Sequence, residues 1–317
     1  MDAATIDRHA EMLANRVRKN DKKLRRGFER EGVDVYRLYD RDIPEVRAVV
    51  DRYADHLVLA VYERTQTADA PHYGDALARA AGEALAIPAA HLHVKKRRTR
   101  PKAGARYERL EERETRIEVR ERALRFLVNL DDYVDTGLFG DHRETRRMIG
   151  EQSGGLRVLN LFGYTGTFTC WAAHGGAART VTVEANPRYV AWTRDNLELN
   201  GLDDPKHELV TGDVGPFIDG AAAASFDLVI VDPPSFSTRF GAGDFDVQRD
   251  HRALLTRVAR VVAPGGRALF STNHQRFEPW IEGLPFARVE EITERTVPVD
   301  YRNRTVHRAF WLEAPES

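Results

Sequence analysis

The sequence predicts an α/β fold, with a parallel sheet in the second half of the chain and a smaller α+β region before it. From Leu156 onward, short apolar runs alternate with helical stretches, and several of these runs end in an acidic residue or a glycine turn. The alternation is absent before about residue 130. Because strand and helix alternate in parallel sheets with right-handed crossovers, we expect two domains, residues 1–130 and 131–317.

The individual elements follow from the same patterns. In the second half, strands are expected at 156–162, 180–183, 208–210, 226–231 and 267–271, with helices at 166–174, 187–200 and 246–262. In the first half we expect a basic helix at 7–31, strands at 33–39 and 56–62, a helix at 72–86, and further strands near 92–94 and 118–130, the last as a hairpin.

The composition excludes several classes of protein. The formal net charge is −1, so no overall basic field indicates a nucleic-acid partner, and any such signal has to be local. A single cysteine rules out an internal disulfide framework, and the charged N-terminal region does not resemble a secretory signal. No uncharged run approaches the roughly 20 residues of a membrane span. By elimination we expect a cytoplasmic protein with no membrane partner.

The most informative segment is residues 226–236 (FDLVIVDPPSF). Its first six residues are apolar apart from Asp227, which indicates a strand buried on both faces, and the two prolines end it by removing backbone donors. An Asp beside free carbonyls can hold the N–H edge of a nitrogen-rich ring, while an aromatic side chain stacks on its face. A strand that ends in a proline-rich turn is the structural alternative. The candidate catalytic residues are Asp232, Pro233, Pro234 and Phe236.

A second candidate site lies where residues 158–162 run into a glycine turn and the start of a helix. Glycines there let the backbone approach a bound nucleoside, and an acid at the end of the next strand can accept from ribose hydroxyls. A dinucleotide-binding dehydrogenase shares these features, but here the loop is G-x-x-G and a third strand also ends in an acid, which could accept from an adenine amino group. The candidate cofactor-binding residues are Phe162, Gly163, Tyr164, Thr165, Gly166, Glu184, Ala185, Asp213, Val214 and Asp232.

The order of these motifs predicts the type of enzyme. Acids after the second and third strands, followed by Asp-Pro-Pro after the fourth, are the signature of class I (Rossmann-like) S-adenosylmethionine-dependent methyltransferases. Enzymes that methylate nucleobase nitrogens hold their target with such an Asp-Pro-Pro segment. We therefore expect S-adenosyl-L-methionine as the cofactor.

The chain also resembles a known family over almost its whole length. The motifs that carry the resemblance are residues 14–20 (ANRVRKN), 135–143 (DTGLFGDHR), 160–166 (NLFGYTG), 232–236 (DPPSF) and 245–251 (FDVQRDH). Residues 10–313 are similar to the second half of the fused bacterial 23S rRNA methyltransferases RlmKL, which makes N7-methylguanine. The resemblance implies a free-standing guanine-N7 enzyme that acts on 23S rRNA, free or in a large-subunit precursor, and it brings Asp141 and Arg143 to the methionine end of the donor. Gly140 and Ser235 depart from the family pattern without removing a chemical group.

Two local basic segments fit an RNA partner. Residues 15–30 and 93–109 each carry eight Lys or Arg and at most two acids. Such one-sided patches in the first domain can hold several phosphates with a salt-dependent affinity. A solvated helix face and a charged hairpin loop are the structural alternatives. The candidate RNA-binding residues are Arg16, Arg18, Lys19, Lys22, Lys23, Lys95, Lys96, Arg97 and Arg98.

The predicted chemistry is mainly positioning. Guanine N7 carries an in-plane lone pair and no proton, so it needs alignment with the methyl group rather than a general base. We expect Asp232 and the Pro233 carbonyl to hold the N1–H and amino edge of the guanine and Phe236 to stack on the flipped base. Arg249 and Asn273 are candidate donors to O6.

Other activities remain open. The DPPSF segment would serve the exocyclic N2 amine of guanine equally well. Cytosine C5 methylation needs a cysteine nucleophile, whereas the only cysteine, Cys170, is expected to be a small core residue. A non-catalytic RNA-binding factor and an NAD-dependent oxidoreductase are alternatives from other classes.

Several residues also have structural interpretations. Asp141 can act as the N-cap of the helix that follows it, and Arg249 and His251 can form surface pairs at a helix start. Asn200 and Gly201 are expected to end a helix. The histidines show no metal-ligand spacing along the sequence, so no metal is expected.

Overall fold

The chain forms two compact units in a computed structural model that describes all residues except 63, 68, 98–114, 241–242 and 317. The first unit comprises residues 1–136 and 299–303, and the second comprises 137–298 and 304–317. The boundary thus follows Thr136 rather than residue 130, and a short segment near the C-terminus returns to the first unit. No helix in the described part of the chain is both long enough and apolar enough to cross a bilayer.

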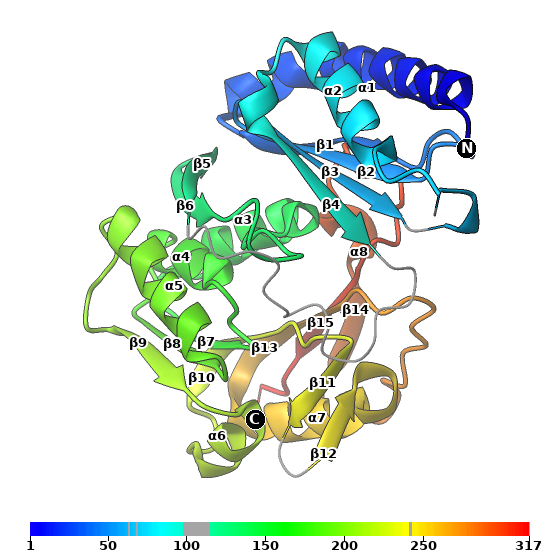
Figure 1. The fold of residues 1–317 in the computed structure, drawn as a ribbon. Helices are drawn as coiled ribbons and strands as arrows, with labels where there is room; N and C mark the ends of the chain where they lie inside the picture. Colours follow the sequence, from blue (N-terminus) through cyan, green and yellow to red (C-terminus); the bar gives the residue numbers. More distant parts are fainter. Residues whose placement is uncertain (63, 68, 98–114, 241–242, 317) are drawn as a thin grey trace. The chain divides into compact units, whose positions relative to one another are not determined.

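The first unit contains a four-stranded sheet with two helices packed on one face (Figure 1). The helices are α1 (Ala3–Glu31) and α2 (Tyr73–Leu85), and the strands, in spatial order, are β1 (Val35–Asp40), β2 (Ala48–Tyr53), β3 (His56–Tyr62) and β4 (Leu92–Arg97). Strands β1 to β3 are antiparallel, whereas β4 runs parallel to β3 after the α2 crossover. The predicted hairpin is β5 (Ile117–Glu121) and β6 (Leu124–Val128). Strand β2 was not predicted.

Both ends of the long helix α1 are capped. The Asp2 carboxylate accepts a hydrogen bond from the Thr5 N–H at 2.8 Å, and Gly32 ends the helix in the left-handed region, with φ of 70°. Its apolar side chains, among them Leu13 and Val17, are buried against the sheet. Most charged residues of α1 lie on the opposite, solvated face, whereas Asp21 is buried and accepts a hydrogen bond from the Tyr36 hydroxyl at 3.0 Å.

The second unit is built on a seven-stranded sheet in which all strands but β15 run in the same direction. Its order is β14 (Arg288–Glu291), β15 (Arg308–Glu313), β13 (Val262–Thr272), β10 (Phe226–Val231), β7 (Arg157–Leu161), β8 (Arg179–Glu184) and β9 (His207–Thr211). Strand β15 is antiparallel to both β13 and β14. The predicted α/β fold is confirmed, although β14 and β15 were not predicted.

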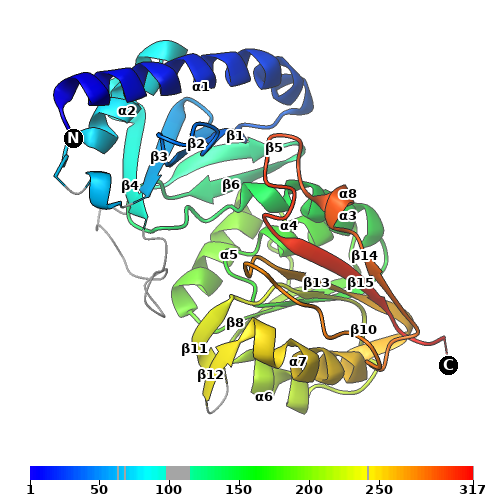
Figure 2. The ribbon, with the colours of Figure 1, turned by 90° about the vertical axis from the view of Figure 1, so that its right-hand side faces the viewer.

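Helices cover both faces of this sheet (Figures 1 and 2). Residues that alternate along the strands point to opposite faces, as Leu159 and Val158 do in β7. One face packs against α6 (Val214–Gly220) and α7 (Val247–Val261), and the other against α3 (Arg143–Gln152), α4 (Thr167–His174) and α8 (Thr293–Thr296). Helix α5 (Pro187–Leu199) lies beside α4 along β8 and β9. A small hairpin, β11 (Phe236–Phe240) and β12 (Gly243–Asp246), follows β10.

The strand order places the candidate site residues at one edge. Strands β7 and β10 are neighbours, with Leu161 opposite Val231, and the chain winds away from this pair in opposite directions. Ligands of open α/β sheets bind outside the carboxyl ends of the strands at such a switch point. The loops after β7, β8, β9 and β10 all begin at this edge.

Candidate functional site

The loop after β7 has a strained backbone at two large residues and packs closely at two glycines. Phe162 and Tyr164 adopt positive φ angles of 58° and 48°, which is uncommon for large residues. Gly163 and Gly166 allow close packing, because a Cβ atom would lie 2.3 Å from Thr182 Cγ2 at the first position and 2.2 Å from Thr193 Cγ2 at the second. The loop backbone therefore lies tight against β8 and α5.

Glu184, at the end of β8, holds this loop in place. Its Oε2 accepts a hydrogen bond from the Tyr164 N–H at 2.9 Å, and its Oε1 accepts one from the Asn186 N–H at 2.8 Å. Burial raises the pKa of Glu184, while these backbone donors lower it. Each carboxylate oxygen can accept more than one hydrogen bond, so Glu184 can also accept from ribose hydroxyls beside the loop.

Asp213 lies at the carboxyl end of β9, where α6 begins. Its side chain makes no capping hydrogen bond to that helix and is partly exposed, whereas the next residue, Val214, is buried in the core. Ala185 is also partly exposed at the end of β8. Asp213 is thus free to accept from an adenine amino group, with apolar side chains nearby.

The carboxylate of Asp232 is fixed at the end of β10. Its Oδ1 accepts a hydrogen bond from Ser271 Oγ at 2.7 Å, and its Oδ2 lies 3.8 Å from His142 Nε2. The side chain remains 25% exposed, so it can still meet a ligand. Burial, and then the neighbouring His307, lower the pKa of His142. A neutral His142 therefore faces this carboxylate.

The residues after Asp232 form an exposed edge. Pro233 is buried and Pro234 is partly exposed, while the Phe236 ring is 50% exposed and meets His274 edge-on at 5.7 Å between ring centroids. Beside it, Ser235 Oγ donates to Asn273 Oδ1 at 2.7 Å. A carboxylate, an exposed aromatic face and an amide thus lie along one short stretch of surface.

The segment before α3 packs against the C-terminal region of the same unit. Helix α3 begins at Arg143 with His142 at its N-cap position, so the structural interpretation of Asp141 as the N-cap is wrong. Oδ2 of the buried Asp141 carboxylate lies 3.1 Å from His307 Nδ1. The His142 and His307 rings stack at 4.2 Å, and Arg143 is almost fully buried at the first turn of α3.

Of the interpretations made for four further residues, three are correct and one is wrong. Cys170 is fully buried, and burial raises the pKa of its thiol, as expected for a core residue. Arg249 forms the expected surface pair with Asp250, but His251 is fully buried, and its Nε2 accepts from the Trp280 N–H at 3.0 Å. The interpretation of His251 as a surface residue is thus wrong. Gly201 ends α5 with a positive φ of 65°, as predicted.

Comparison with known proteins gives the family. The model for S-adenosylmethionine-dependent methyltransferases matches residues 39–296. The chain belongs to this methyltransferase family. Proteins named ribosomal RNA large subunit methyltransferase K/L are 44% identical over 97% of this chain in Allochromatium vinosum and 40% identical over 99% in Alcanivorax borkumensis. Because these matches cover 43% and 45% of the relatives, the chain spans less than half of their length.

Solved structures agree on the fold of this methyltransferase. One methyltransferase crystallised with SAH has a TM-score of 0.77 at 22% identity, with 96% of this chain and 82% of that chain covered. A methyltransferase from Streptococcus mutans has a TM-score of 0.74 at 21% identity, with 96% and 81% covered. These structures confirm the predicted fold class, and the match to the family model confirms the S-adenosylmethionine cofactor, so the NAD-dependent oxidoreductase alternative is wrong.

The residues of this methyltransferase fit the donor chemically. The Gly163–Gly166 turn offers a close backbone, Glu184 and Asp213 offer acceptors for ribose and adenine, and the buried Val214 offers an apolar contact. These groups follow three neighbouring strands at one sheet edge. The assignment of each residue to the donor remains a prediction.

The basic residues predicted to bind RNA differ in exposure. Arg18, Lys19, Lys22 and Lys23 are exposed on α1, and the partly exposed Arg16 pairs with Asp42 at 3.3 Å.

In β4, Lys96 is exposed and Arg97 is partly exposed, 3.9 Å from Asp135. Lys95 is 4% exposed, and its Nζ donates to the Tyr133 carbonyl at 2.5 Å. Its assignment to the basic surface is therefore wrong, because strand alternation turns it inward. Arg98 lies outside the described residues.

Three site residues were not predicted from the sequence. Ser271, which fixes Asp232, ends a strand paired with β10, so the predicted strand order could have indicated it. His142 was seen only as part of a motif before a helix. His307 gave no local signal, because its partner Asp141 lies 166 positions away in the sequence.

Proposed function

We propose that this methyltransferase modifies guanine N7 in 23S rRNA. The observation that carries the proposal is the edge formed by the fixed carboxylate of Asp232 and the exposed ring of Phe236, at the sheet end where the donor loop also begins. Support comes from relatives named ribosomal RNA large subunit methyltransferase K/L. The resemblance of residues 10–313 to the half of RlmKL that makes N7-methylguanine favours N7.

The proposed hold on the base follows from the polarity of this edge. An ionised carboxylate and a carbonyl accept but do not donate, so Asp232 and the Pro233 carbonyl match the N1–H and amino group of guanine. Phe236 is half-exposed, so its ring can stack on a base taken out of its helix. Asn273, whose Oδ1 is held by Ser235, keeps its amide N–H groups for the guanine O6.

This hold leaves N7 as the reacting atom. When the amino edge of guanine faces Asp232, N7 lies on the opposite side of the ring system and carries an unshared in-plane pair. Bound S-adenosylmethionine supplies a methyl group on a positively charged sulfur. The residues of the chain orient the base, and alignment of the reacting atoms is the main source of acceleration. No side chain has to remove a proton before the transfer.

Guanine N2 is the second candidate target, because acceptors such as Asp232 and the Pro233 carbonyl can also hold an exocyclic amine during methylation. In that case the amino group itself would face the donor. Cytosine C5 is disfavoured, because the thiol of Cys170 is fully buried and burial raises its pKa. The two guanine atoms are distinguished by base analogues.

The decisive assay uses the purified chain with undermodified 23S rRNA fragments that carry one analogue at the target guanine. 7-Deazaguanosine, which lacks N7, should abolish methyl transfer, whereas inosine, which lacks the amino group, should still accept a methyl group more slowly. The reverse result would establish N2. Mass mapping of 23S rRNA from cells with and without the gene locates the target and should show loss of an N7-methylguanine.

Variants of Asp232 test the proposed hold. We expect Asp232→Ala and Asp232→Asn to lower kcat/KM for rRNA by about 10- to 100-fold, because each loses a charged acceptor for the base. Asp203→Ala, at an exposed acid on the loop before β9, is the matched control and should remain active. Full activity in both Asp232 variants would remove this residue from the mechanism.

A further inference from the structure

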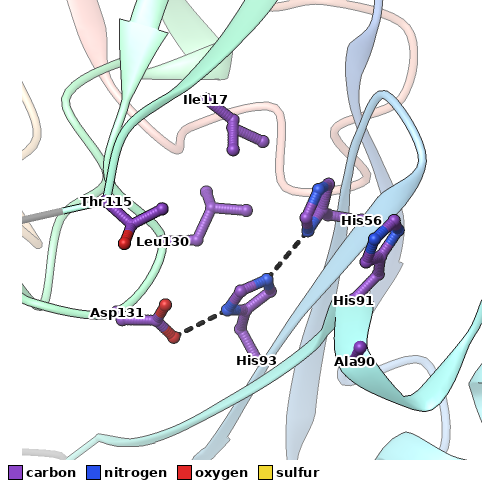
Figure 3. A pocket seen from close by; sticks show the side chains of 8 residues that line it. All are labelled: His56, Ala90, His91, His93, Thr115, Ile117, Leu130 and Asp131. Carbon is purple, nitrogen blue, oxygen red and sulfur yellow. Dashed lines mark hydrogen bonds and ion pairs between the residues drawn. The ribbon is translucent and has the colours of Figure 1, made fainter. Parts of the chain in front are cut away.

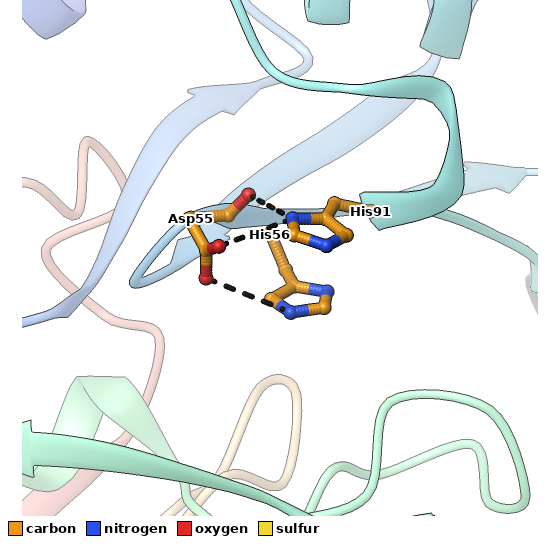
Figure 4. A group of neighbouring side chains, drawn as sticks. All are labelled: Asp55, His56 and His91. Atoms are coloured by element: carbon orange, nitrogen blue, oxygen red, sulfur yellow. Dashed lines mark hydrogen bonds and ion pairs between the residues drawn. The ribbon is translucent and has the colours of Figure 1, made fainter.

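A cluster of histidine and aspartate side chains lies in the first unit, in the same unit as the basic helix and separate from the methyl-transfer residues. Asp55 and His56 come from the turn into β3, and His91 ends the 3-10 helix η2 (Ala89–His91) just before β4. Figure 4 shows the two imidazole rings one above the other, with the Asp55 carboxylate facing both. The ring centroids are 4.1 Å apart, and the rings are nearly parallel.

Possible ligand atoms of all three residues lie close together. Asp55 Oδ2 lies 3.2 Å from His91 Nδ1, and Asp55 Oδ1 lies 3.6 Å from His56 Nε2. One ligand atom from each of the three residues lies within 4.8 Å of the others. Ligands bound to Zn²⁺ at about 2.0–2.2 Å in a tetrahedron are separated by roughly 3.3 Å. The carboxylate is therefore spaced to share an ion with either histidine, and because the two rings stack, one imidazole has to turn for both lone pairs to point at the same ion.

A hydrogen-bonded relay prepares His56 as a ligand. Asp131 Oδ1 lies 2.7 Å from His93 Nδ1, and His93 Nε2 lies 3.0 Å from His56 Nδ1 (Figure 3). When His93 Nδ1 donates to the Asp131 carboxylate, His93 Nε2 can accept from His56 Nδ1–H, and this arrangement leaves the lone pair of His56 Nε2 for a ligand. Metal-bound histidines are held by the same kind of partner on their second nitrogen.

The surroundings leave His56 Nε2 open to a cation. This nitrogen lies 3.6 Å from the Asp55 carboxylate, too far for a hydrogen bond, whereas His91 Nδ1 lies 3.2 Å from the Asp55 backbone oxygen and has to give up that contact to bind an ion. Asp55 is 70% exposed and gives an entry path, while a cavity of about 340 Å³ lined by His56, His91, His93 and Asp131 leaves room for water ligands (Figure 3).

We propose that Asp55, His56 and His91 form a site for a divalent transition-metal ion of the zinc type, oriented by His93 and Asp131. Two imidazoles and one carboxylate suit Zn²⁺ or Co²⁺ better than Mg²⁺ or Ca²⁺, which prefer oxygen ligands. His91 lies 35 positions after His56 in the sequence, which is why no metal spacing was visible there. The bound ion would link the β2–β3 turn to the start of β4.

The second histidine cluster is less suited to a metal. Asp141, His142 and His307 are also close together, but all three are buried, so no exposed ligand offers an ion an entry path as Asp55 does. This cluster also adjoins Asp232 in the methyl-transfer site. It serves here as an internal comparison for the experiment.

The test uses the untagged full-length chain, stripped of metal with a chelator. Co²⁺ alone is titrated while the ligand-field absorption of tetrahedral Co²⁺ and the heat of binding are followed, and Zn²⁺ is then added in competition. We expect one Co²⁺ per chain, displaced by Zn²⁺, and a higher Tm with Zn²⁺, because an ion that binds only the folded state stabilises it. Absence of the absorption band, or binding of Mg²⁺ in its place, would overturn the proposal.

Variants locate the ion. His91→Ala and Asp55→Ala each remove one partly or largely exposed ligand and should abolish the Co²⁺ band, while Asp131→Asn should weaken Co²⁺ binding by about 10- to 100-fold by loosening the relay. Circular dichroism of the metal-free variants shows whether they are folded.

The matched control is His72→Ala, at an exposed histidine 3.9 Å from Asp75, which should bind Co²⁺ like the parent chain. Unchanged binding in both His91→Ala and Asp55→Ala would refute the assignment. So would loss of the band in His142→Ala with retention in His91→Ala, since the ion would then occupy the second cluster.

Discussion

At the scale of single residues, the donor loop depends on glycine for two separate reasons. Gly166 has a φ of 74°, which a residue with a Cβ adopts only with strain, and it packs against Thr193 so closely that a Cβ would overlap that side chain. Thr193 in turn donates to the Tyr164 carbonyl at 3.1 Å. A larger residue at 166 would therefore displace both the loop backbone and the α5 residue that holds it.

Gly166→Ala should lower the free energy of unfolding by about 2–5 kcal/mol, the sum of left-handed strain and overpacking. Gly201→Ala is the matched control, because Gly201 has a similar φ of 65° but nothing within 4 Å of its would-be Cβ. It should cost only about 1–2 kcal/mol. Urea unfolding measures both, and calorimetry should show weaker S-adenosylmethionine binding in Gly166→Ala alone. Equal losses of stability would mean that the contact with Thr193 has no role.

Much of the candidate site could be predicted at this scale because its residues follow strands. Glu184, Asp213 and Asp232 each come directly after a recognisable apolar run, and parallel strands bring their carboxyl ends to one edge. His142 and His307 could not be found in this way. They come together through packing between segments that no local pattern connects.

At the scale of elements, α1 presents a continuous basic face. Lys19, Lys22, Lys23 and Arg26 are all exposed and follow the i, i+3, i+4, i+7 spacing of one side of a helix. Among the described residues, no acidic side chain forms an ion pair with the three lysines. These cations are therefore available to phosphates, whereas Arg25 is paired with Glu29 on the same helix.

Replacement of Lys19, Lys22 and Lys23 by alanine should weaken binding to 23S rRNA fragments. Because each phosphate contact contributes about 0.7–0.9 to the slope of log K against log salt, the triple variant should lose up to roughly 2–3 from that slope. Filter binding over a range of salt concentrations gives the slope.

The control for the α1 variant is an equal loss of charge elsewhere. Arg179, Lys206 and Arg295 in the second unit are exposed, and each is paired with an acid. Their triple replacement by alanine should leave the salt slope unchanged. If both variants lost the same slope, the effect would reflect overall charge and α1 would not be the RNA-binding element.

The elements themselves could be predicted where their pattern is local. The runs that became β7, β8 and β10 are short, apolar and bounded by turns, so their places were correct. Strands β14 and β15 are antiparallel edge additions whose sequences mix charged and apolar residues, and β2 carries Asp51 and Arg52 in its centre. Such strands are specified by the neighbours they pair with more than by their own residues.

At the scale of the whole molecule, the buried ammonium of Lys95 makes stability depend on pH. Lys95 was predicted to lie on the basic surface, but its ammonium is buried in the first unit and donates to the carbonyls of Tyr133 and Val134. Burial lowers the pKa of Lys95 to about 8, against roughly 10.4 in an unfolded chain. Below pH 8 both states hold the proton, so the cost of the buried charge is constant.

Between pH 8 and about 10.4 the unfolded chain binds more protons at Lys95 than the folded chain, so this residue makes stability rise with pH. The rise is at most about 3 kcal/mol. Lys95→Met removes it and preserves much of the side-chain volume. We therefore expect the free energy of unfolding of the parent chain, minus that of Lys95→Met, to increase from pH 7.5 to pH 10 in urea titrations followed by circular dichroism. Other titrating groups are common to both proteins and cancel in the difference.

The control is Lys96→Met, one residue along β4 at an exposed position, which should give a difference that does not change with pH. A flat or falling difference for Lys95→Met would show that its hydrogen bonds to the two carbonyls outweigh the loss of solvation.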